Sequence, residues 1–118
     1  MSEERELTPT DASELAASGG GQLVDVRTQE EWDAGHLSDA RHIPIDALST
    51  GVGQLDQSKP VILYCRGGDR SGAAADALGA SGWDARHIAG GLVAWVDAGL
   101  PLSPEGGEVA QPSGLPPA

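Results

Sequence analysis

The run Pro60-Val61-Ile62-Leu63-Tyr64 is followed at once by Cys65-Arg66-Gly67-Gly68-Asp69-Arg70-Ser71-Gly72. Four apolar or aromatic residues after a proline indicate a short strand that is covered on both faces, as the central strand of a parallel sheet is. Beyond the glycines, Ala73, Ala74, Ala77 and Leu78 recur at helical spacing, and Ser81-Gly82 ends that helix. The stretch therefore predicts a strand, a glycine-rich loop and a helix in direct succession.

Strand and helix patterns alternate along the rest of the chain. Short strands are expected over residues 22–26, 41–44 and 84–88. Helices are expected from a Thr10-Asp11 cap to Ala17, over 29–34 with Thr28 and Glu31 as a capping box, and over 92–96. Residues 45–48 can form a helical turn, and residues 50–53 are expected to be loop. The alternation predicts an α/β fold, with helices on both sides of a parallel sheet.

One domain, residues 1–102, accounts for most of the 118 residues. From Ser103 to Ala118 the composition changes: seven of these sixteen residues are Gly or Pro, and only Val109 and Leu115 are large aliphatics. A segment with so few apolar side chains cannot bury enough surface to fold alone. Residues 103–118 are therefore predicted to be a disordered or loosely packed tail.

Composition excludes several kinds of partner. The net charge of −11, with 7 basic and 18 acidic residues, argues against binding to a nucleic-acid backbone. It fits a solvated acidic surface or adaptation to high salt, and Lys59 is the only lysine. No apolar run approaches the ~18 residues that span a membrane, and the N-terminal residues lack a secretory pattern. With a single cysteine no internal disulfide is possible, so we expect a reducing compartment, the cytoplasm.

Cys65 is expected at the carboxyl end of its strand, where parallel α/β sheets bind ligands. Successive N–H groups of a glycine-rich loop, together with the following helix N-terminus, favour a thiolate, which is the nucleophilic form of cysteine. Gly67 and Gly68 allow close backbone approach, and Arg66 and Arg70 supply forked donors for an oxyanion, although the sequence does not say which of them points inward. The alternative is that Cys65 is an inert buried residue.

Three motifs in consistent order, between about Leu7 and Leu102, resemble the rhodanese family, in particular its single-domain members. The loop from Cys65 to Ser71 resembles the rhodanese active-site loop. The stretch from Asp25 to Leu37, with Ala40-Arg41-His42-Ile43-Pro44, resembles the N-terminal signature of the family. The segment Gly90-Gly91-Leu92-Val93-Ala94-Trp95, with Gly99-Leu100-Pro101, resembles its C-terminal signature. The resemblance implies a three-layer fold with a mainly parallel five-stranded sheet and helices on both faces.

The same resemblance implies sulfurtransfer. Cys65 would accept sulfane sulfur from a donor such as thiosulfate and pass the persulfide sulfur to cyanide, a thiol or a protein. The N–H groups of Arg66, Gly67, Gly68, Asp69, Arg70 and Ser71 would cradle the persulfide, and Arg66 and Arg70 are candidates to hold a sulfonate. No metal or organic cofactor is implied. With no second cysteine, the persulfide must be discharged to another molecule.

Two other functions remain open. Phosphatases with a cysteine nucleophile have a loop of the pattern Cys-x5-Arg. In this chain Arg70 follows Cys65 after four residues, and the shorter loop favours a single sulfur atom over a phosphoryl or arsenate group. The second alternative is a binding or regulatory module of the same fold that does no chemistry. Inactive modules often lack the cysteine, so Cys65 favours the enzyme.

Asp69 places a carboxylate beside the intended anion site, which disfavours an incoming anion. One interpretation is that Asp69 caps the following helix and points away. The other is that it weakens thiosulfate binding and tunes the choice of donor.

Residues outside the loop are expected to support it. Asp25 and Arg27 end a strand at the same edge and are predicted to brace the loop through an ion pair or hydrogen bonds. His36 is predicted to be a structural hydrogen-bonding residue, and the three histidines are too scattered for a metal site. The remaining residues have expected structural roles: Glu30 and Glu31 in the first turn of a helix, Trp32 and Trp95 in the core, and Trp83 in a turn.

Overall fold

The core of the molecule is a five-stranded sheet in a computed structural model that describes residues 5–103 and 107–109. Its strands are β1 (Glu6–Leu7), β2 (Gln22–Asp25), β3 (Arg41–His42), β4 (Val61–Tyr64) and β5 (Ala85–Ile88). They lie in the order β1-β5-β4-β2-β3, and each neighbouring pair is parallel. The predicted α/β fold with a mainly parallel five-stranded sheet is confirmed.

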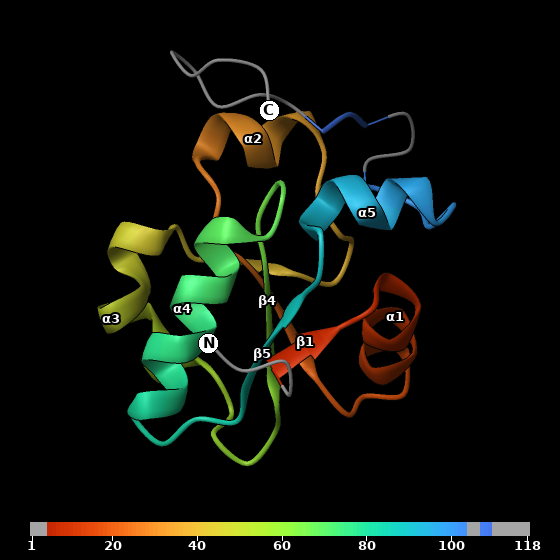
Figure 1. Cartoon of the computed structure of the whole chain (residues 1–118). Coiled ribbons are helices and arrows are strands. Elements are labelled where there is room, and N and C mark those ends of the chain that lie inside the picture. The colour runs from red at the N-terminus through yellow and green to blue at the C-terminus, as the bar shows by residue number, and fades with distance from the viewer. Residues whose placement is uncertain (1–4, 104–106, 110–118) are drawn as a thin grey trace.

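Helices cover both faces of this sheet (Figure 1). One face carries α1 (Pro9–Ala17) and α5 (Gly91–Asp97), and the other carries α3 (Leu48–Gly51) and α4 (Asp69–Ala80). The short helix α2 (Gln29–Ala34) lies beyond one end of the sheet, next to the loop that follows β4 (Figure 1). Two 3-10 turns, η2 (Ile45–Ala47) and η3 (Val52–Gln54), flank α3.

Strand β4 joins the two halves of the hydrophobic core. Its four side chains are fully buried, and they alternate between the faces, as successive residues of a strand do. Val61 and Leu63 pack in the cluster under α3 and α4, whereas Ile62 and Tyr64 pack in the cluster under α1 and α5. Each buried aliphatic side chain contributes about 1.5–3 kcal/mol, so the start of the following loop is firmly anchored.

Several boundaries differ from the sequence prediction. Helix α1 is capped by Thr8, whose side chain accepts a hydrogen bond from the N–H of Asp11 at 3.1 Å; the predicted Thr10-Asp11 cap is wrong because Pro9 already occupies the first helical position. The predicted loop at 50–53 is helical, formed by the end of α3 and the start of η3. Its glycines suggested a loop, but Gly51 lies close against Ile43 and its lack of a side chain allows that packing.

Part of the predicted tail contacts the domain. The backbones of Ser103 and His36 exchange two hydrogen bonds, and the N–H of Glu108 donates to the carbonyl of Ala34 at 2.8 Å. Val109 packs against the cluster under α1 and α5. The rest of the tail, residues 104–106 and 110–118, lies outside the described residues, so the boundary at 102 and the looseness of the tail stay predictions.

Within the described part of the chain, none of the helices has both the length and the apolar character required to cross a membrane.

The first turn of α5 holds the loop that follows β4. The N–H groups of Leu92 and Val93 donate to the carbonyls of Cys65 and Arg66, at 2.8 and 3.0 Å. Gly91 permits this approach: it has a φ of +61°, and a Cβ there would lie 2.6 Å from the Cys65 oxygen and 2.5 Å from the Arg66 oxygen. Any side chain at position 91 would therefore push α5 away from the loop.

We expect Gly91→Ala to lower the free energy of unfolding by at least about 2 kcal/mol, from left-handed backbone strain and the backbone clash together. Urea denaturation measures this. Gly53→Ala is the control, because no described atom lies within 4 Å of its Cβ position, and it should change stability by less than about 0.5 kcal/mol. Equal stability of the two variants would contradict this account of Gly91.

Candidate active site

Cys65 follows β4 directly, and the loop from 66 to 71 curls around its sulfur. The side chain is 1% exposed. The N–H groups of Gly68 and Ser71 donate to Sγ at 3.1 and 3.4 Å, and the Ser71 hydroxyl oxygen lies 3.5 Å away. Two of the N–H groups expected to form the cradle thus point at the sulfur, and such donors stabilise negative charge on it.

The turn into α4 depends on Gly68. This residue caps the helix with a φ of +106°, a conformation that residues with a side chain rarely adopt. Asp69 is the first residue of α4 and is exposed. The expectation that Asp69 caps the helix is wrong: among the described residues the cap has no side-chain hydrogen bond, because the left-handed Gly68 makes the turn instead.

Arg70 is tied to a buried carboxylate on α2. Its two terminal nitrogens donate to the two oxygens of Glu31 at 2.8 and 2.9 Å, and Glu31 is fully buried while the Arg70 side chain is 32% exposed. Burial acts to raise the pKa of Glu31, but the hydrogen bonds from Arg70 and Thr28, with the charges of Arg70 and Arg27, outweigh it and lower that pKa. The hydrogen bond to Glu31 raises the pKa of Arg70.

Arg66 is in a different position. It is half-buried, and its Nε has no hydrogen-bond partner in the part of the chain that the structure describes. The sequence alone did not distinguish Arg66 from Arg70, but the structure does: both terminal nitrogens of Arg70 bind Glu31, whereas Arg66 Nε has no partner among the described residues. Arg66 therefore has a donor that no described residue uses, whereas Arg70 is anchored and its charge is paired with Glu31.

Asp25 and Arg27 form the predicted ion pair at the end of β2. Both side chains are fully buried, and Arg27 Nη2 lies 2.7 Å from Asp25 Oδ2. The same nitrogen donates to the carbonyl of Gly35, and the guanidinium lies over the ring of Tyr64, 5.6 Å from its centroid. The pair therefore joins β2, the end of α2 and the last residue of β4, directly before Cys65.

The aromatic and imidazole groups near α2 have structural contacts. His36 Nδ1 lies 2.8 Å from the carbonyl oxygen of Trp32, and the two rings stack at 3.6 Å. His42 also stacks on Trp32, and its Nε2 lies 2.8 Å from the carbonyl oxygen of Arg27. Trp95 is buried and donates to the carbonyl of Pro101. The structural interpretation of His36 agrees with these contacts.

The sequence did not identify His87 or Glu6 as neighbours of the loop. His87 lies on β5 with its Nδ1 3.5 Å from the Ser71 hydroxyl oxygen, and its Nε2 lies 3.9 Å from Glu6 on β1. No local pattern marks these residues, because only the pairing of β1, β5 and β4 brings them together. Among the described residues, no group of three or more His, Cys, Asp or Glu side chains is placed to bind a metal.

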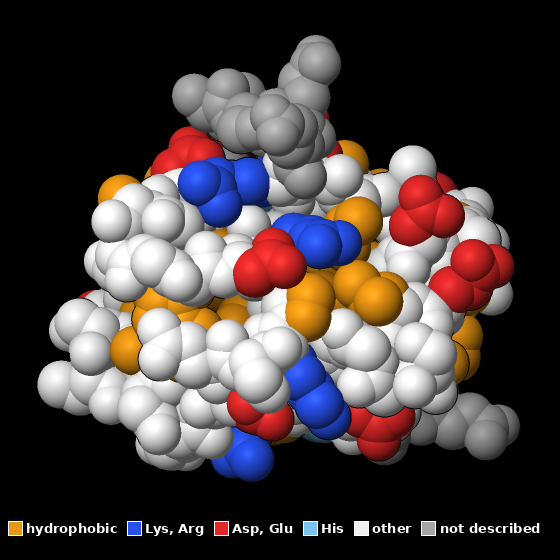
Figure 2. Space-filling model, turned by 90° about the horizontal axis from the view of Figure 1, so that it is seen from below, with side chains coloured by type: hydrophobic (Ala, Val, Ile, Leu, Met, Phe, Trp, Pro, Cys, Tyr) orange, Lys and Arg blue, Asp and Glu red, His pale blue; other side chains and the backbone are white. Residues whose placement is uncertain are grey.

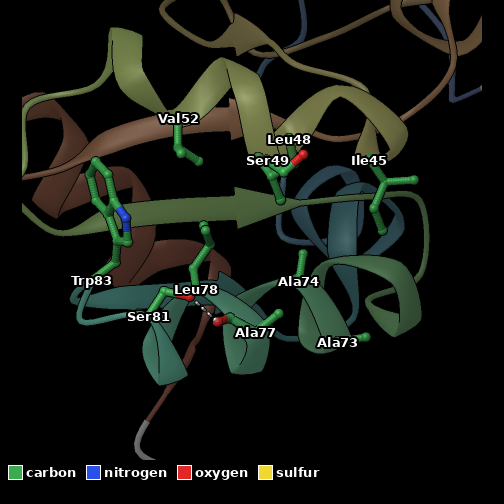
Figure 3. A pocket seen from close by; sticks show the side chains of 10 residues that line it. All are labelled: Ile45, Leu48, Ser49, Val52, Ala73, Ala74, Ala77, Leu78, Ser81 and Trp83. Atoms are coloured by element: carbon green, nitrogen blue, oxygen red, sulfur yellow. Dashed lines mark hydrogen bonds between the residues drawn. The ribbon is translucent and has the colours of Figure 1, made fainter.

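Two pockets lie along α4. An apolar pocket of about 540 Å³ separates α4 from η2, α3 and η3, and Figure 3 shows the side chains that face each other across it, with Trp83 at one end. Residues 65–71 are not among those that line it. A second pocket, of about 400 Å³, adjoins the loop itself and is lined by Gly67, Gly68, Asp69 and His87 among others. The smaller pocket is therefore the one that adjoins the loop, although Cys65 itself does not line it.

Charged side chains of both signs are interspersed on the face seen from below, and the basic ones do not merge into one patch there (Figure 2). Charges of both signs mixed in this way are typical of a solvated surface. The absence of a nucleic-acid partner stays a prediction.

Comparisons with known proteins agree with this geometry. Residues 8–98 match the family model described as Rhodanese-like domain. The chain is 31% identical over 96 residues to "Thiosulfate sulfurtransferase GlpE" of Pseudomonas putida, which covers 80% of this chain and 87% of that protein. A rhodanese-related protein of Thermoplasma volcanium superposes with a TM-score of 0.78 at 28% identity, covering 86% of this chain and 99% of that one.

Several relatives are longer than this chain. It is 39% identical over 93 residues to "Probable adenylyltransferase/sulfurtransferase MoeZ" of Mycobacterium tuberculosis, a match that covers 75% of this chain but 24% of that protein. In two further relatives the chain spans 54% and 60% of the length.

The buried pair at the end of β2 can be tested against an exposed pair with the same spacing. We expect Asp25→Asn to lower the free energy of unfolding by about 3–5 kcal/mol, because it leaves the buried Arg27 charge uncompensated. Asp84→Asn is the matched control, since Asp84 and Arg86 are also two residues apart but have side chains 55% and 33% exposed. The control should cost less than about 1 kcal/mol in urea denaturation. Similar losses in both variants would contradict the bracing role of Asp25.

The Glu31–Arg70 pair predicts a pH dependence. Because the pKa of Glu31 is lowered in the folded state, its stabilisation is present above the usual value near 4.5 and is lost as the pH falls through the folded-state value. We therefore expect the wild-type protein to be more stable than Glu31→Gln at pH 7, and the difference to shrink towards pH 3. Glu30→Gln, at the exposed neighbouring position, should show no comparable change. A Glu31→Gln difference that is constant with pH would refute the charged pairing.

Proposed function

Because this chain belongs to the rhodanese-like domain family, we propose that it is a sulfurtransferase that moves sulfane sulfur from a donor such as thiosulfate to a thiophilic acceptor. The sulfur travels as a persulfide on Cys65. The single observation that supports this proposal most is that the N–H groups of Gly68 and Ser71 donate hydrogen bonds to the Cys65 sulfur. They supply a site for one negatively charged sulfur at the end of a buried parallel strand.

In the first half-reaction, the Cys65 thiolate attacks the outer sulfur of thiosulfate. The bond between the two donor sulfurs breaks, and sulfite leaves with the bonding electron pair. In the second, a nucleophile such as cyanide or a thiolate attacks the terminal sulfur of the persulfide, and Cys65 leaves as the thiolate. The N–H groups that face the sulfur stabilise its negative charge before and after each transfer.

Arg66 is the group proposed to hold the sulfonate of thiosulfate, because Arg70 is anchored to Glu31 and its charge is already paired with that carboxylate. Formal charges near the loop cancel: Arg66 and Arg70 are positive, and Glu31 and Asp69 are negative, which gives two minus two. Asp69 is exposed and lines the pocket beside the loop, so it remains a candidate for tuning the donor. A site without excess positive charge also suits donors that carry less charge than thiosulfate.

The acceptor must be an outside molecule, because Cys65 is the sole cysteine. The need for a reduced thiol supports a cytoplasmic location as part of this proposal. Phosphatase or arsenate-reductase chemistry is less well supported: the loop is one residue shorter than Cys-x5-Arg, and Arg70 is engaged with Glu31. If the protein is instead a binding module that does no chemistry, it will not transfer sulfur through Cys65.

We expect the purified protein to form thiocyanate from thiosulfate and cyanide, and Cys65→Ser to form none above the uncatalysed rate, since the serine hydroxyl cannot carry a persulfide. Ser49→Ala, in the apolar pocket away from the loop, is the control and should retain activity within about twofold. Absence of thiocyanate from a folded wild-type protein with any sulfane donor would overturn the enzymatic proposal and favour the binding module.

A further inference from the structure

A chain of polar side chains leads away from Cys65 beneath the loop. Cys65 Sγ lies 3.5 Å from Ser71 Oγ, Ser71 Oγ lies 3.5 Å from His87 Nδ1, and His87 Nε2 lies 3.9 Å from Glu6 Oε2. Ser71 is fully buried, and His87 is 5% exposed. The sulfurtransfer steps above leave His87 without a role.

The fold builds this contact from three elements. On β4 and β5, Leu63 is paired with His87, and Cys65 lies two residues beyond Leu63, so both side chains face α4. The first turns of α4 place Ser71 between them. Gly72 lets the imidazole approach this helix, because a Cβ at position 72 would lie 3.3 Å from His87 Cε1. The ring is therefore held against Ser71 by backbone packing.

One nitrogen of this buried ring is unsatisfied. Among the described residues, His87 Nε2 has no hydrogen-bond partner, although buried polar atoms nearly always have one. The ring also lines the pocket of about 400 Å³ beside the loop, together with Glu6. Nε2 is therefore the ring nitrogen that is free to exchange a proton, and the pocket is the space into which it can do so.

We propose that His87 is a positioning residue that takes up the proton of the Cys65 thiol through Ser71. The Sγ proton moves to Ser71 Oγ while the hydroxyl proton of Ser71 moves to His87 Nδ1. The products are a thiolate at Cys65 and an imidazolium at His87; no electrons are transferred, and each atom keeps its valence. The proposal rests on the proposed function only in taking Cys65 as the reacting group.

The charges that surround His87 suit this role. Glu6 faces it from β1, and Asp69 and Asp76 of α4 line the same pocket. Among the cations, Arg5 is paired with Asp76 at 3.5 Å, and Arg70 of α4 is bound to Glu31. Strand β4 carries no Asp, Glu, His, Lys or Arg, and α5 carries its one charged residue, Asp97, at its far end. Three carboxylates therefore lie around the pocket that the ring lines, and both of these arginines are already paired with a carboxylate.

The Ser71 hydroxyl has a second possible acceptor besides His87, and this gives an alternative in which His87 has only a packing role. The Ser71 hydroxyl also lies 3.3 Å from the carbonyl oxygen of Gly68, to which it can donate. If that bond alone mattered, His87 would only fill space, and its replacement would change stability but not the ionisation of Cys65. The pH dependence of Cys65 reactivity separates the two roles.

The test is the rate of alkylation of Cys65 by iodoacetamide as a function of pH, which requires no sulfur donor. In His87→Asn, which can hydrogen-bond to Ser71 but cannot hold the proton, we expect the midpoint of the profile to rise by about one pH unit. Ser71→Ala should shift it in the same direction, and the double variant should shift it no further than Ser71→Ala alone. His36→Asn, whose ring bonds the carbonyl of Trp32, is the control and should leave the midpoint unchanged.

Coincident profiles for His87→Asn and wild type, or additive shifts in the double variant, would overturn the proposal whether or not the protein transfers sulfur. If His87→Asn fails to fold, NMR titration of the His87 ring decides the matter in wild type and Cys65→Ser. The proposal predicts a lower midpoint in Cys65→Ser, because the ring loses its thiolate partner. Identical midpoints would contradict it.

Discussion

Burial of β4 between two parallel neighbours is the constraint on which the candidate site depends. Its four side chains fill both halves of the core, so the position and direction of the chain at Cys65 are fixed by a strand whose side chains are all buried. Because all strands of a parallel sheet end at the same edge, the ends of β2 and β5 arrive beside this loop. Asp25 and Arg27 come from the first, and Gly91 comes from the second.

Two ion pairs then decide which groups of the loop remain available. The buried Asp25–Arg27 pair ties β2 to the end of α2, and the Glu31–Arg70 pair ties the start of α2 to α4. Both neutralise their arginines locally. The Gly68 and Ser71 N–H groups face the Cys65 sulfur, and Arg66 forms no ion pair with a described residue, so the site is suited to stabilising charge on a sulfur atom more than to collecting a highly charged anion.

Local patterns were sufficient to predict much of this arrangement. The apolar run at β4, the helical period of α4 and the capping box at Thr28 and Glu31 all have short-range causes, and the structure contains each of them. The sequence did not predict β1, because a strand of two residues is too short to show an alternation of apolar and polar side chains. The contacts of Arg70 with Glu31, 39 residues away, and of Ser71 with His87 across the sheet have no local signal. The loop was therefore predictable, but the residues that tune it required the fold.

The most direct measurement of the central claim is the mass of the intact protein after incubation with thiosulfate. The account predicts a gain of one sulfur atom, located on the peptide that contains Cys65, and its loss when cyanide is added. Since the chain has a single cysteine, Cys65→Ser must show no such gain. A wild-type protein that acquires no sulfur from any sulfane donor, or a Cys65→Ser protein that still acquires it, would contradict the account.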